Sequence, residues 1–260
     1  MSSTHIRLEI SDRAPGAVAT ITIDRADSLN ALNTAALVAL AETIEGLATN
    51  SGLRALVLTG AGSKAFSGGA DINEMAALAD PSAARAFITR LHRCCEALRD
   101  LPVPTIARIN GYAFGGAMEI AAACDVRVAV DTAVFGMPEV RLGIPSVIEA
   151  ALLPQLIGWG RTRELLLFGE NFSAAEALEW GFIERVAPAD KLDAVVERWL
   201  QQLAQCTPKA VTAQKRLIRA WEDLPLRDSI EAGIDAFEEA ARTGEPAEAM
   251  AAFLARRRSK

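Results

Sequence analysis

The stretch that decides the fold runs from Asn110 to Glu119 and reads Asn-Gly-Tyr-Ala-Phe-Gly-Gly-Ala-Met-Glu. Its adjacent glycines predict a tight turn, and Glu119 follows the second glycine by three residues. On a helix, Glu119 lies on the same side as Gly115 and Gly116, in otherwise apolar surroundings. Such surroundings are expected to raise the pKa of a glutamate, which suits it to proton transfer.

Two further turns of the same kind flank this stretch. Residues 65–72 read Ala-Phe-Ser-Gly-Gly-Ala-Asp-Ile, and residues 134–139 read Val-Phe-Gly-Met-Pro-Glu. Taken singly, a Gly-rich turn is explained by a helix cap or by close packing. Together, two such turns can each aim a backbone N–H at one carbonyl oxygen, while Glu119 and Glu139 do acid/base work beside it. That combination suits a reaction that runs through an enolate and needs no metal.

One stretch fits a nucleotide-binding fingerprint, but its surroundings do not. Residues 60–65, Gly-Ala-Gly-Ser-Lys-Ala, follow an apolar run and match G-x-G-x-x-A. The fingerprint has to open a helix, whereas this match runs into residues 66–69, Phe-Ser-Gly-Gly, which cannot hold a regular helix. Tyr112 is followed four residues later by Gly116, so the Tyr-x-x-x-Lys pair of short-chain dehydrogenases is missing. We therefore expect no dinucleotide cofactor.

Composition limits the partners and the number of domains. The 260 residues are 51% hydrophobic, enough for a sizeable core in one large domain or in one domain with an appendage. The net charge of −6 argues against a nucleic-acid partner, which would favour clustered positive charge. The one dense basic run, Arg256-Arg257-Arg258, is typical of a solvated tail.

Cysteine and histidine usage narrows the chemistry further. The four cysteines include no CxxC pair, so we expect reduced thiols in a cytoplasmic protein. The first residues lack the pattern of a signal peptide, and no apolar run reaches the ~18 residues of a membrane span. With only His5 and His92 present, we expect neither a zinc site nor a Ser-His-Asp triad. His92 is expected at the surface or with a satisfied side chain.

Strand and helix patterns alternate up to about residue 190, which predicts an α/β fold with layered sheets. Strands are expected at 17–23, 55–58, 105–109 and 126–130, and helices at 32–47, 83–98 and 115–124. Beyond Lys191 only helical patterns occur, at 210–221, 228–241 and 246–256. We therefore predict an α/β core with the catalytic site at residues 1–200 and a helical oligomerisation region at residues 201–260.

In this order along the chain, the three turns resemble the enoyl-CoA hydratase/isomerase (crotonase) superfamily. Further matches cover most of the chain: residues 27–32 (Asp-Ser-Leu-Asn-Ala-Leu), 124–127 (Cys-Asp-Val-Arg), 167–174 (Leu-Phe-Gly-Glu-Asn-Phe-Ser-Ala), 181–183 (Gly-Phe-Ile) and 252–257 (Ala-Phe-Leu-Ala-Arg-Arg). The resemblance implies a spiral of β-β-α units and a C-terminal helical region that makes trimer contacts. It also implies assembly into a homotrimer or a homohexamer.

The resemblance assigns roles to individual residues. The N–H groups of Ala70 and Gly116 would form the oxyanion hole for an acyl-CoA thioester carbonyl, and Glu119 and Glu139 match the two catalytic glutamates of hydratases. Coenzyme A is part of the substrate and not a separate cofactor. The positions where relatives hold that substrate correspond here to Ser28, Ala70, Asp71, Ile72, Asn73, Gly116 and Arg256. Of these, Arg256 would reach the CoA phosphate of a neighbouring subunit.

One segment departs from the family. After the second glutamate, many hydratases continue Leu-Gly-Ile-x-Pro-Gly-x-Gly-Gly, a turn that helps to hold the catalytic water and shapes the acyl pocket. Residues 142–154 read Leu-Gly-Ile-Pro-Ser-Val-Ile-Glu-Ala-Ala-Leu-Leu-Pro, one residue shorter and without those glycines. The bulky apolar residues of segment 145–154 would narrow or reroute the acyl pocket. Glu149 either adds a carboxyl group near the site or points to solvent, and we expect it to point to solvent, as charged side chains mostly do.

The predicted function is hydration of a 2-trans-enoyl-CoA to a 3-hydroxyacyl-CoA in fatty acid metabolism. The presence of both glutamates favours hydration, since many relatives with other chemistry lack one of them. An enoyl-CoA isomerase or an acyl-CoA hydrolase of the same family is the alternative, because Glu139 alone can shuttle protons. An RNA-binding relative is a further alternative, which the acidic composition disfavours.

Overall fold

The computed structural model describes residues 5–258; residues 1–4 and 259–260, at the outer ends of the two predicted regions, lie outside the described residues. A six-stranded sheet forms the backbone of the core, in the order β1-β2-β3-β5-β7-β10. Only β1 and β2 pair antiparallel; the other neighbours are parallel. The strands are β1 (Ile6–Arg13), β2 (Gly16–Ile23), β3 (Leu53–Gly60), β5 (Thr105–Ile109), β7 (Val126–Val130) and β10 (Arg185–Ala187).

A second, smaller sheet has four strands of three residues each. They are β4 (Ala65–Ser67), β6 (Tyr112–Phe114), β8 (Val134–Gly136) and β9 (Asn171–Ser173), in the order β4-β6-β8-β9. Three times, the chain passes from a strand of the large sheet to a strand of the small sheet and then into helix, beginning with β3, β5 and β7. The predicted spiral of β-β-α units is therefore confirmed, and it stacks the three turns that follow β4, β6 and β8 side by side.

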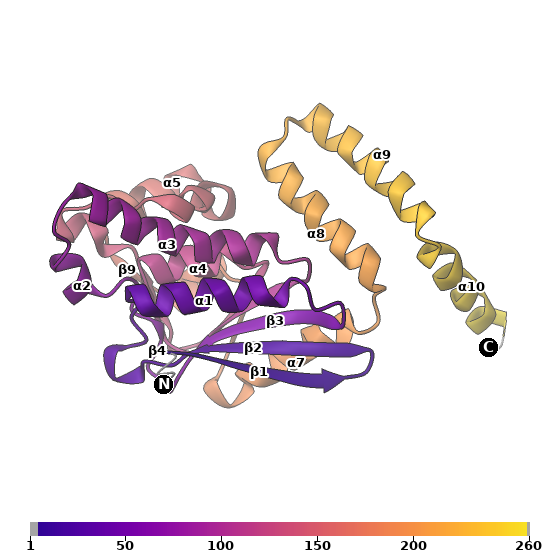
Figure 1. The fold of residues 1–260 in the computed structure, drawn as a ribbon, viewed down its shortest axis with the longest axis horizontal. Coiled ribbons are helices and arrows are strands. Elements are labelled where there is room, and N and C mark those ends of the chain that lie inside the picture. The colour runs from indigo at the N-terminus through magenta and orange to yellow at the C-terminus, as the bar shows by residue number, and fades with distance from the viewer. Residues whose placement is uncertain (1–4, 259–260) are drawn as a thin grey trace.

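Helices cover the large sheet and fill the space between the layers. They are α1 (Thr34–Leu47), α2 (Ile72–Ala76), α3 (Pro81–Asp100), α4 (Gly116–Ala123), α5 (Leu153–Phe168), α6 (Ala174–Trp180) and α7 (Leu192–Leu203). Short 3-10 turns are η1 (Ala26–Ser28), η2 (Pro138–Leu142), η3 (Ile148–Leu152) and η4 (Ala189–Lys191). α1 and α3 run side by side along the large sheet (Figure 1), and all eight residues of α4 are buried.

Two elements differ from the sequence prediction for clear local reasons. The helix expected from residue 32 begins at Thr34, because the Asn33 side chain caps it by accepting a hydrogen bond from the Ala36 N–H at 2.9 Å. β1 was not expected from the sequence. Ile6, Leu8 and Ile10 alternate with polar residues as in a strand, but only Ile6 is buried, so the strand depends on its pairing with β2.

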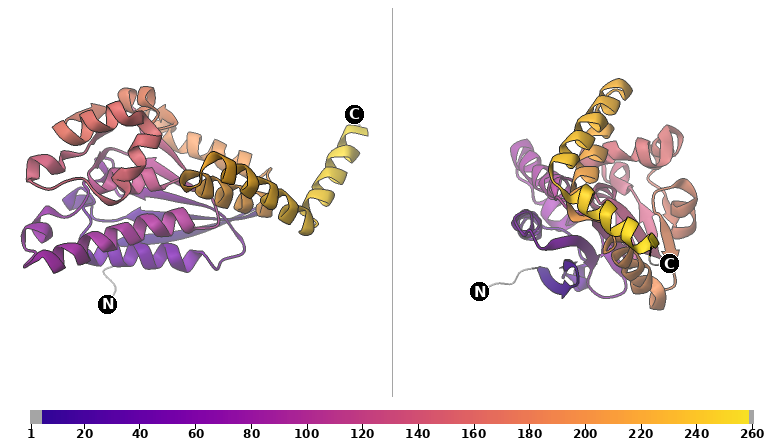
Figure 2. Two further views of the ribbon diagram at one scale, coloured as in Figure 1. Left: turned by 90° about the horizontal axis from the view of Figure 1, so that it is seen from above. Right: turned by 90° about the vertical axis from the view of Figure 1, so that its right-hand side faces the viewer.

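Beyond α7, three helices form an arm that projects from the core (Figures 1 and 2). They are α8 (Pro208–Asp223), α9 (Leu226–Arg242) and α10 (Glu245–Arg258), close to the three helices expected in the tail. The division into regions 1–200 and 201–260 stays a prediction. Among residues 5–258, none of the helices combines the length and apolar character that a membrane span requires.

A buried lysine on α8 anchors the arm to the core. The ammonium group of Lys215 donates hydrogen bonds to the carbonyl oxygens of Leu98 and Val103, both at 3.0 Å, and lies 2.8 Å from the Asp125 carboxylate. Lys215 is only 8% exposed, and its three partners come from the end of α3, the loop before β5 and the loop before β7. This single side chain therefore joins the arm to three parts of the core.

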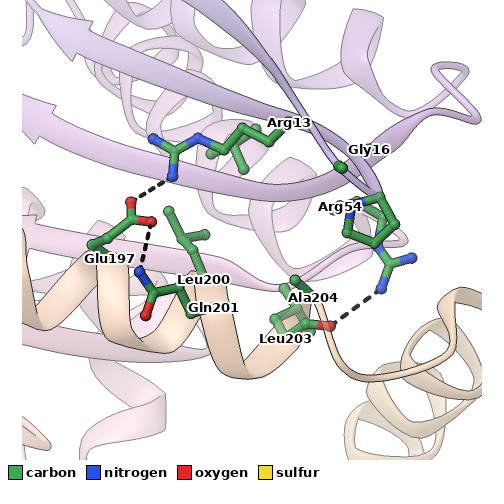
Figure 3. A pocket seen from close by; sticks show the side chains of 11 residues that line it. Arg13, Gly16, Arg54, Glu197, Leu200, Gln201, Leu203 and Ala204 are labelled. Atoms are coloured by element: carbon green, nitrogen blue, oxygen red, sulfur yellow. Dashed lines mark hydrogen bonds and ion pairs between the residues drawn. The ribbon is translucent and has the colours of Figure 1, made fainter.

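Two cavities lie away from the three turns. One of about 810 Å³ separates the arm from the ends of α1 and α3, and its lining includes Thr49, Pro102 and Arg216. The other, of about 90 Å³, lies between the β1–β2 hairpin and α7 (Figure 3). There Glu197 accepts hydrogen bonds from Arg13 and Gln201, so the polar groups satisfy one another and hold α7 on the sheet. Neither lining includes a glutamate predicted to be catalytic.

Candidate active site

The turns after β4 and β6 touch one another through their glycines. Gly69 has a φ of +85°, and a Cβ placed on it would lie 2.4 Å from the carbonyl oxygen of Phe114 and 3.4 Å from the nitrogen of Gly116. Both the backbone conformation and the close approach require glycine at this position. The two predicted donor turns are thus brought into direct contact.

Each of these turns has an unused backbone N–H at the position that the resemblance assigns to the oxyanion hole. In the first turn, the Gly68 N–H donates to the Leu29 carbonyl at 2.7 Å and the Gly69 N–H donates to the Ser67 hydroxyl at 3.1 Å. The next N–H, that of Ala70, donates to no other residue within 5–258, and the same holds for the Gly116 N–H. Gly116 is also the first residue of α4, where the helix dipole is positive. Two donors from adjacent turns therefore remain available to an external oxygen.

The segments predicted to hold coenzyme A lie next to the first donor turn. The loop that contains Ser28 runs alongside it, since the Leu32 N–H donates to the Gly69 carbonyl at 2.8 Å. Asp71 caps α2 by accepting a hydrogen bond from the Asn73 N–H at 3.1 Å, and it pairs with Arg25 at 3.0 Å. The ion pair and these hydrogen bonds lower the pKa of Asp71 against the opposing effect of burial, which is the largest single influence.

Ile72 and Arg256, two further residues predicted to bind coenzyme A, lie in different parts of the molecule. Ile72, on α2 beside the donor turn, has a side chain that is 58% exposed, and its role in substrate binding stays a prediction. Arg256 belongs to α10, at the far end of the projecting arm (Figure 1), and is not brought to the turns of its own chain. The expectation that Arg256 serves a neighbouring subunit stays a prediction.

Glu119 lies on α4 with its carboxyl group inside the protein. The residue is 4% exposed, and its Oε1 accepts a hydrogen bond from the Ala150 N–H at 3.3 Å. Burial and then the nearby charge of Glu139 raise the pKa of Glu119 to about 8, in spite of the opposing Ala150 hydrogen bond. The expectation of a raised pKa, drawn from the apolar residues around Glu119, agrees with this environment.

Glu139 lies on η2, and its carboxyl group approaches the turn that precedes α4. A Cβ on Gly115, whose φ is +53°, would lie 2.4 Å from the Glu139 Oε1, so the carboxyl group rests directly on the bare backbone of the turn before α4. The Ser146 hydroxyl donates to the Glu139 Oε2 at 3.0 Å. Burial raises the pKa of Glu139. Gly115 directly precedes α4, the helix that carries Glu119, and the charge of Glu139 contributes to the raised pKa of Glu119, so the two glutamates belong to one site.

The segment that departs from the family pattern supports both glutamates. Ser146 binds Glu139, and Ala150 binds Glu119, so the segment spans the two carboxyl groups. Between them, Ile148 has a φ of +40°, a strained conformation for a β-branched residue. Ile148 and Leu152 pack partly buried against the core. Their expected effect on the acyl pocket stays a prediction.

The expectation that Glu149 points to solvent is wrong. Glu149 is 7% exposed, and its Oε1 lies 2.8 Å from the Nδ1 of His92 on α3. The backbone turn at Ile148 directs this side chain inward, between α3 and α4, where His92 satisfies one of its oxygens. His92 itself is half-exposed and satisfied, as expected, but its partner was not foreseen.

Sequence reasoning missed three residues of this region: Ser146, Glu149 and His92. The sequence did contain a signal for the first two, because they stand where relatives have glycine and therefore had to place side chains near the site. His92 gave no signal, since 57 residues separate it from its partner.

Comparison with known proteins places these features in a family. Residues 13–260 match the family model of enoyl-CoA hydratase/isomerase. The chain is 34% identical to the short-chain-enoyl-CoA hydratase of Clostridium acetobutylicum over 94% of its own length and 93% of that protein. It is also 34% identical to a carnitinyl-CoA dehydratase of Salmonella enteritidis, over 82% of its own length and 81% of that protein.

Solved structures agree with the fold and with the family. The enoyl-CoA hydratase of Bacillus anthracis superposes with a TM-score of 0.90 at 32% identity, covering 96% of each chain. Pseudomonas aeruginosa DspI superposes equally well, with a TM-score of 0.90 at 32% identity over 98% of this chain and 96% of that one. The predicted α/β fold is confirmed by these likenesses. The chain therefore belongs to the enoyl-CoA hydratase/isomerase family, as its three turns predict.

Proposed function

We propose that the chain is an enoyl-CoA hydratase, which adds water across the C2–C3 double bond of a 2-trans-enoyl-CoA and gives a 3-hydroxyacyl-CoA. One observation supports this above the others: the buried carboxyl group of Glu119 and the partly buried carboxyl group of Glu139 both lie at the start of α4, beside two unused backbone donors. Relatives named as enoyl-CoA hydratases at about one-third identity support the same activity.

In this proposal the thioester oxygen binds between the N–H groups of Ala70 and Gly116. Attack on C3 pushes electrons through C2 onto that oxygen, which gains enolate character. Two fixed donors stabilise the developing charge, and a single donor of this type is typically worth ~3–4 kcal/mol of barrier. The N-terminus of α4 adds its positive dipole at the same point.

The two glutamates then move the protons. Ionised Glu119 takes a proton from water as the water oxygen bonds to C3, and protonated Glu139 gives a proton to C2. The product leaves with all atoms of the water, and a proton passed from Glu119 to Glu139 restores the starting state. Because the charge of Glu139 helps to raise the pKa of Glu119, the two carboxyl groups share one proton, and the reactive form is the one in which Glu139 carries it.

A direct assay tests the proposal. Purified protein is mixed with a series of 2-trans-enoyl-CoAs from short to long and branched, and loss of the conjugated thioester absorbance is followed with product identification. Glu119→Gln and Glu139→Gln should each lower kcat by at least ~10²-fold. Glu164→Gln, an exposed glutamate on α5 that pairs with Arg161, is the matched control and should keep full activity. Near-full hydration by either active-site variant would remove that residue from the mechanism.

The products of this assay also separate the alternatives. Release of free CoA thiol would indicate an acyl-CoA hydrolase, and a shifted double bond without added water would indicate an isomerase. Binding of RNA on a filter over a salt series would indicate the RNA-binding alternative. We propose that coenzyme A enters only as part of the substrate, with no separate cofactor, and that the reaction belongs to fatty acid metabolism.

We also propose a homotrimer or homohexamer in the cytoplasm. The arm exposes large apolar side chains that a single chain leaves uncovered: Ile218, Trp221, Leu224, Leu226, Ile230, Ile234, Phe237, Met250, Phe253 and Leu254. Burial of such a surface against another copy is the usual reason for its presence. All four cysteines are unpaired, which is typical of proteins from a reducing compartment.

A further inference from the structure

A third carboxyl group lies beside the two proposed catalytic glutamates. Glu149 is more than nine-tenths buried, and its Oε1 lies 2.8 Å from the Nδ1 of His92. Its Oε2 is buried and has no hydrogen-bond partner among the described residues. Buried polar atoms nearly always find partners, so an unpaired carboxyl oxygen at this position calls for a functional explanation.

The titratable groups that face Glu149 come from the two helices packed against it, α3 and α4. From α3 come His92 and the fully buried thiol of Cys95, whose pKa is raised by burial, then by the charges of Glu149 and Glu119, and also by its side-chain contact with Glu149. From α4 comes Glu119. Among residues 5–258, His92 is the basic side chain that contacts Glu149, and it is 46% exposed.

The backbone links Glu149 to Glu119 directly. Ala150, the next residue, donates its N–H to the Glu119 Oε1. The strained φ of +40° at Ile148 sets the turn that directs Glu149 and Ala150 into the interior. The negative charge of Glu149 raises the pKa of Glu119 after the larger effects of burial and of Glu139. One short turn thus gives Glu119 both a hydrogen bond and a charged neighbour.

We infer that Glu149, held by His92, is a positioning residue that governs when Glu119 gives up its proton. The inference rests on the proposed function, because it assigns Glu119 the part of the base. A carboxylate beside a second negative charge holds its proton to higher pH, so removing the charge of Glu149 favours ionised Glu119. Glu149 needs no contact with substrate to act in this way.

The kinetic test compares Glu149→Gln with wild type. The substitution removes the charge but keeps size and hydrogen-bonding capacity beside His92. The limb of kcat/KM that rises with pH should move about half a pH unit or more to lower pH, which means about threefold more ionised Glu119 on that limb. Glu149→Asp restores the charge and should move the limb back, and Glu164→Gln should leave it in place. A limb that is unchanged in Glu149→Gln would overturn the inference.

A second measurement needs no activity. The side-chain carboxyl carbon of Glu119 is titrated by NMR on protein labelled with carbon-13 in glutamate, with the signal assigned by its loss in Glu119→Gln. The Glu119 titration should fall to lower pH in Glu149→Gln. A Glu119 titration that Glu149→Gln leaves in place would refute the coupling. If wild type hydrates no enoyl-CoA, the proposed function fails while this titration still decides the coupling.

Discussion

Gly115→Ala is expected to disable the site by displacing a carboxyl group. The new Cβ would lie 2.4 Å from the Glu139 Oε1, whereas ordinary van der Waals contact begins at 3.4 Å. The carboxyl group therefore has to move by about 1 Å, and a misplacement of that size typically costs ~10²-fold in rate. The φ of +53° at this position adds ~1–3 kcal/mol of backbone strain for alanine.

The assay measures kcat for enoyl-CoA hydration together with the thermal midpoint of unfolding. Gly158→Ala is the matched control, because Gly158 also has a positive φ, of +76°, but a Cβ placed on it would meet no atom within 4 Å. Both variants should lose a few degrees in the midpoint, whereas only Gly115→Ala should lose about 10²-fold in kcat. Full activity of folded Gly115→Ala would refute the claim that Glu139 depends on its contact with this turn.

Three further predictions concern pH, the arm and assembly. The pKa of Glu119 is raised from 4.5 to about 8, so ionising this buried carboxyl group destabilises the fold as pH rises from 4.5 to 8. Glu119→Gln cannot ionise, so its thermal midpoint should rise relative to that of wild type between pH 5 and pH 8. A difference in midpoint that stays constant over this range would contradict the prediction. Lys215→Met should cost ~1–3 kcal/mol in urea unfolding by leaving the carbonyl oxygens of Leu98 and Val103 without their buried donor, while exposed Lys191→Met should be neutral. Deleting residues 246–260 should weaken both assembly in light scattering and CoA binding, and an intact trimer with wild-type CoA affinity would count against a shared site.

The sequence predicts the parts of the fold that bury apolar side chains. β3, whose eight residues are all buried, and α3, with an apolar stripe on one side, both follow from hydrophobic pattern alone. β1 shows strand alternation at Ile6, Leu8 and Ile10 but buries only Ile6, so its conformation is decided by pairing with β2. The three-residue strands of the small sheet are likewise set by their neighbours in space and not by local propensity.

The residues of the proposed site likewise divide into those that the sequence predicts and those that it does not. Glu119, Glu139 and the two donor turns are readable because small residues and acids stand at fixed spacing. The inward turn of Glu149 is not readable, because it depends on a left-handed residue, Ile148, and on a histidine from another helix. From local sequence alone, a charged side chain is expected to face solvent, because a buried partner becomes visible only in the fold.

The two donors near the start of α4 and after β4 are main-chain groups, and this affects how such a protein can evolve. Every residue type except proline supplies an N–H, so no ordinary exchange of side chains at position 70 or 116 deletes either donor. Selection therefore has to preserve the path of the backbone, which depends on glycines such as Gly69. A Cβ placed on Gly69 would lie 2.4 Å from the Phe114 carbonyl oxygen. Descendants can therefore replace the acids and acquire new reactions while the pair of N–H groups persists, because it is passed on with the fold.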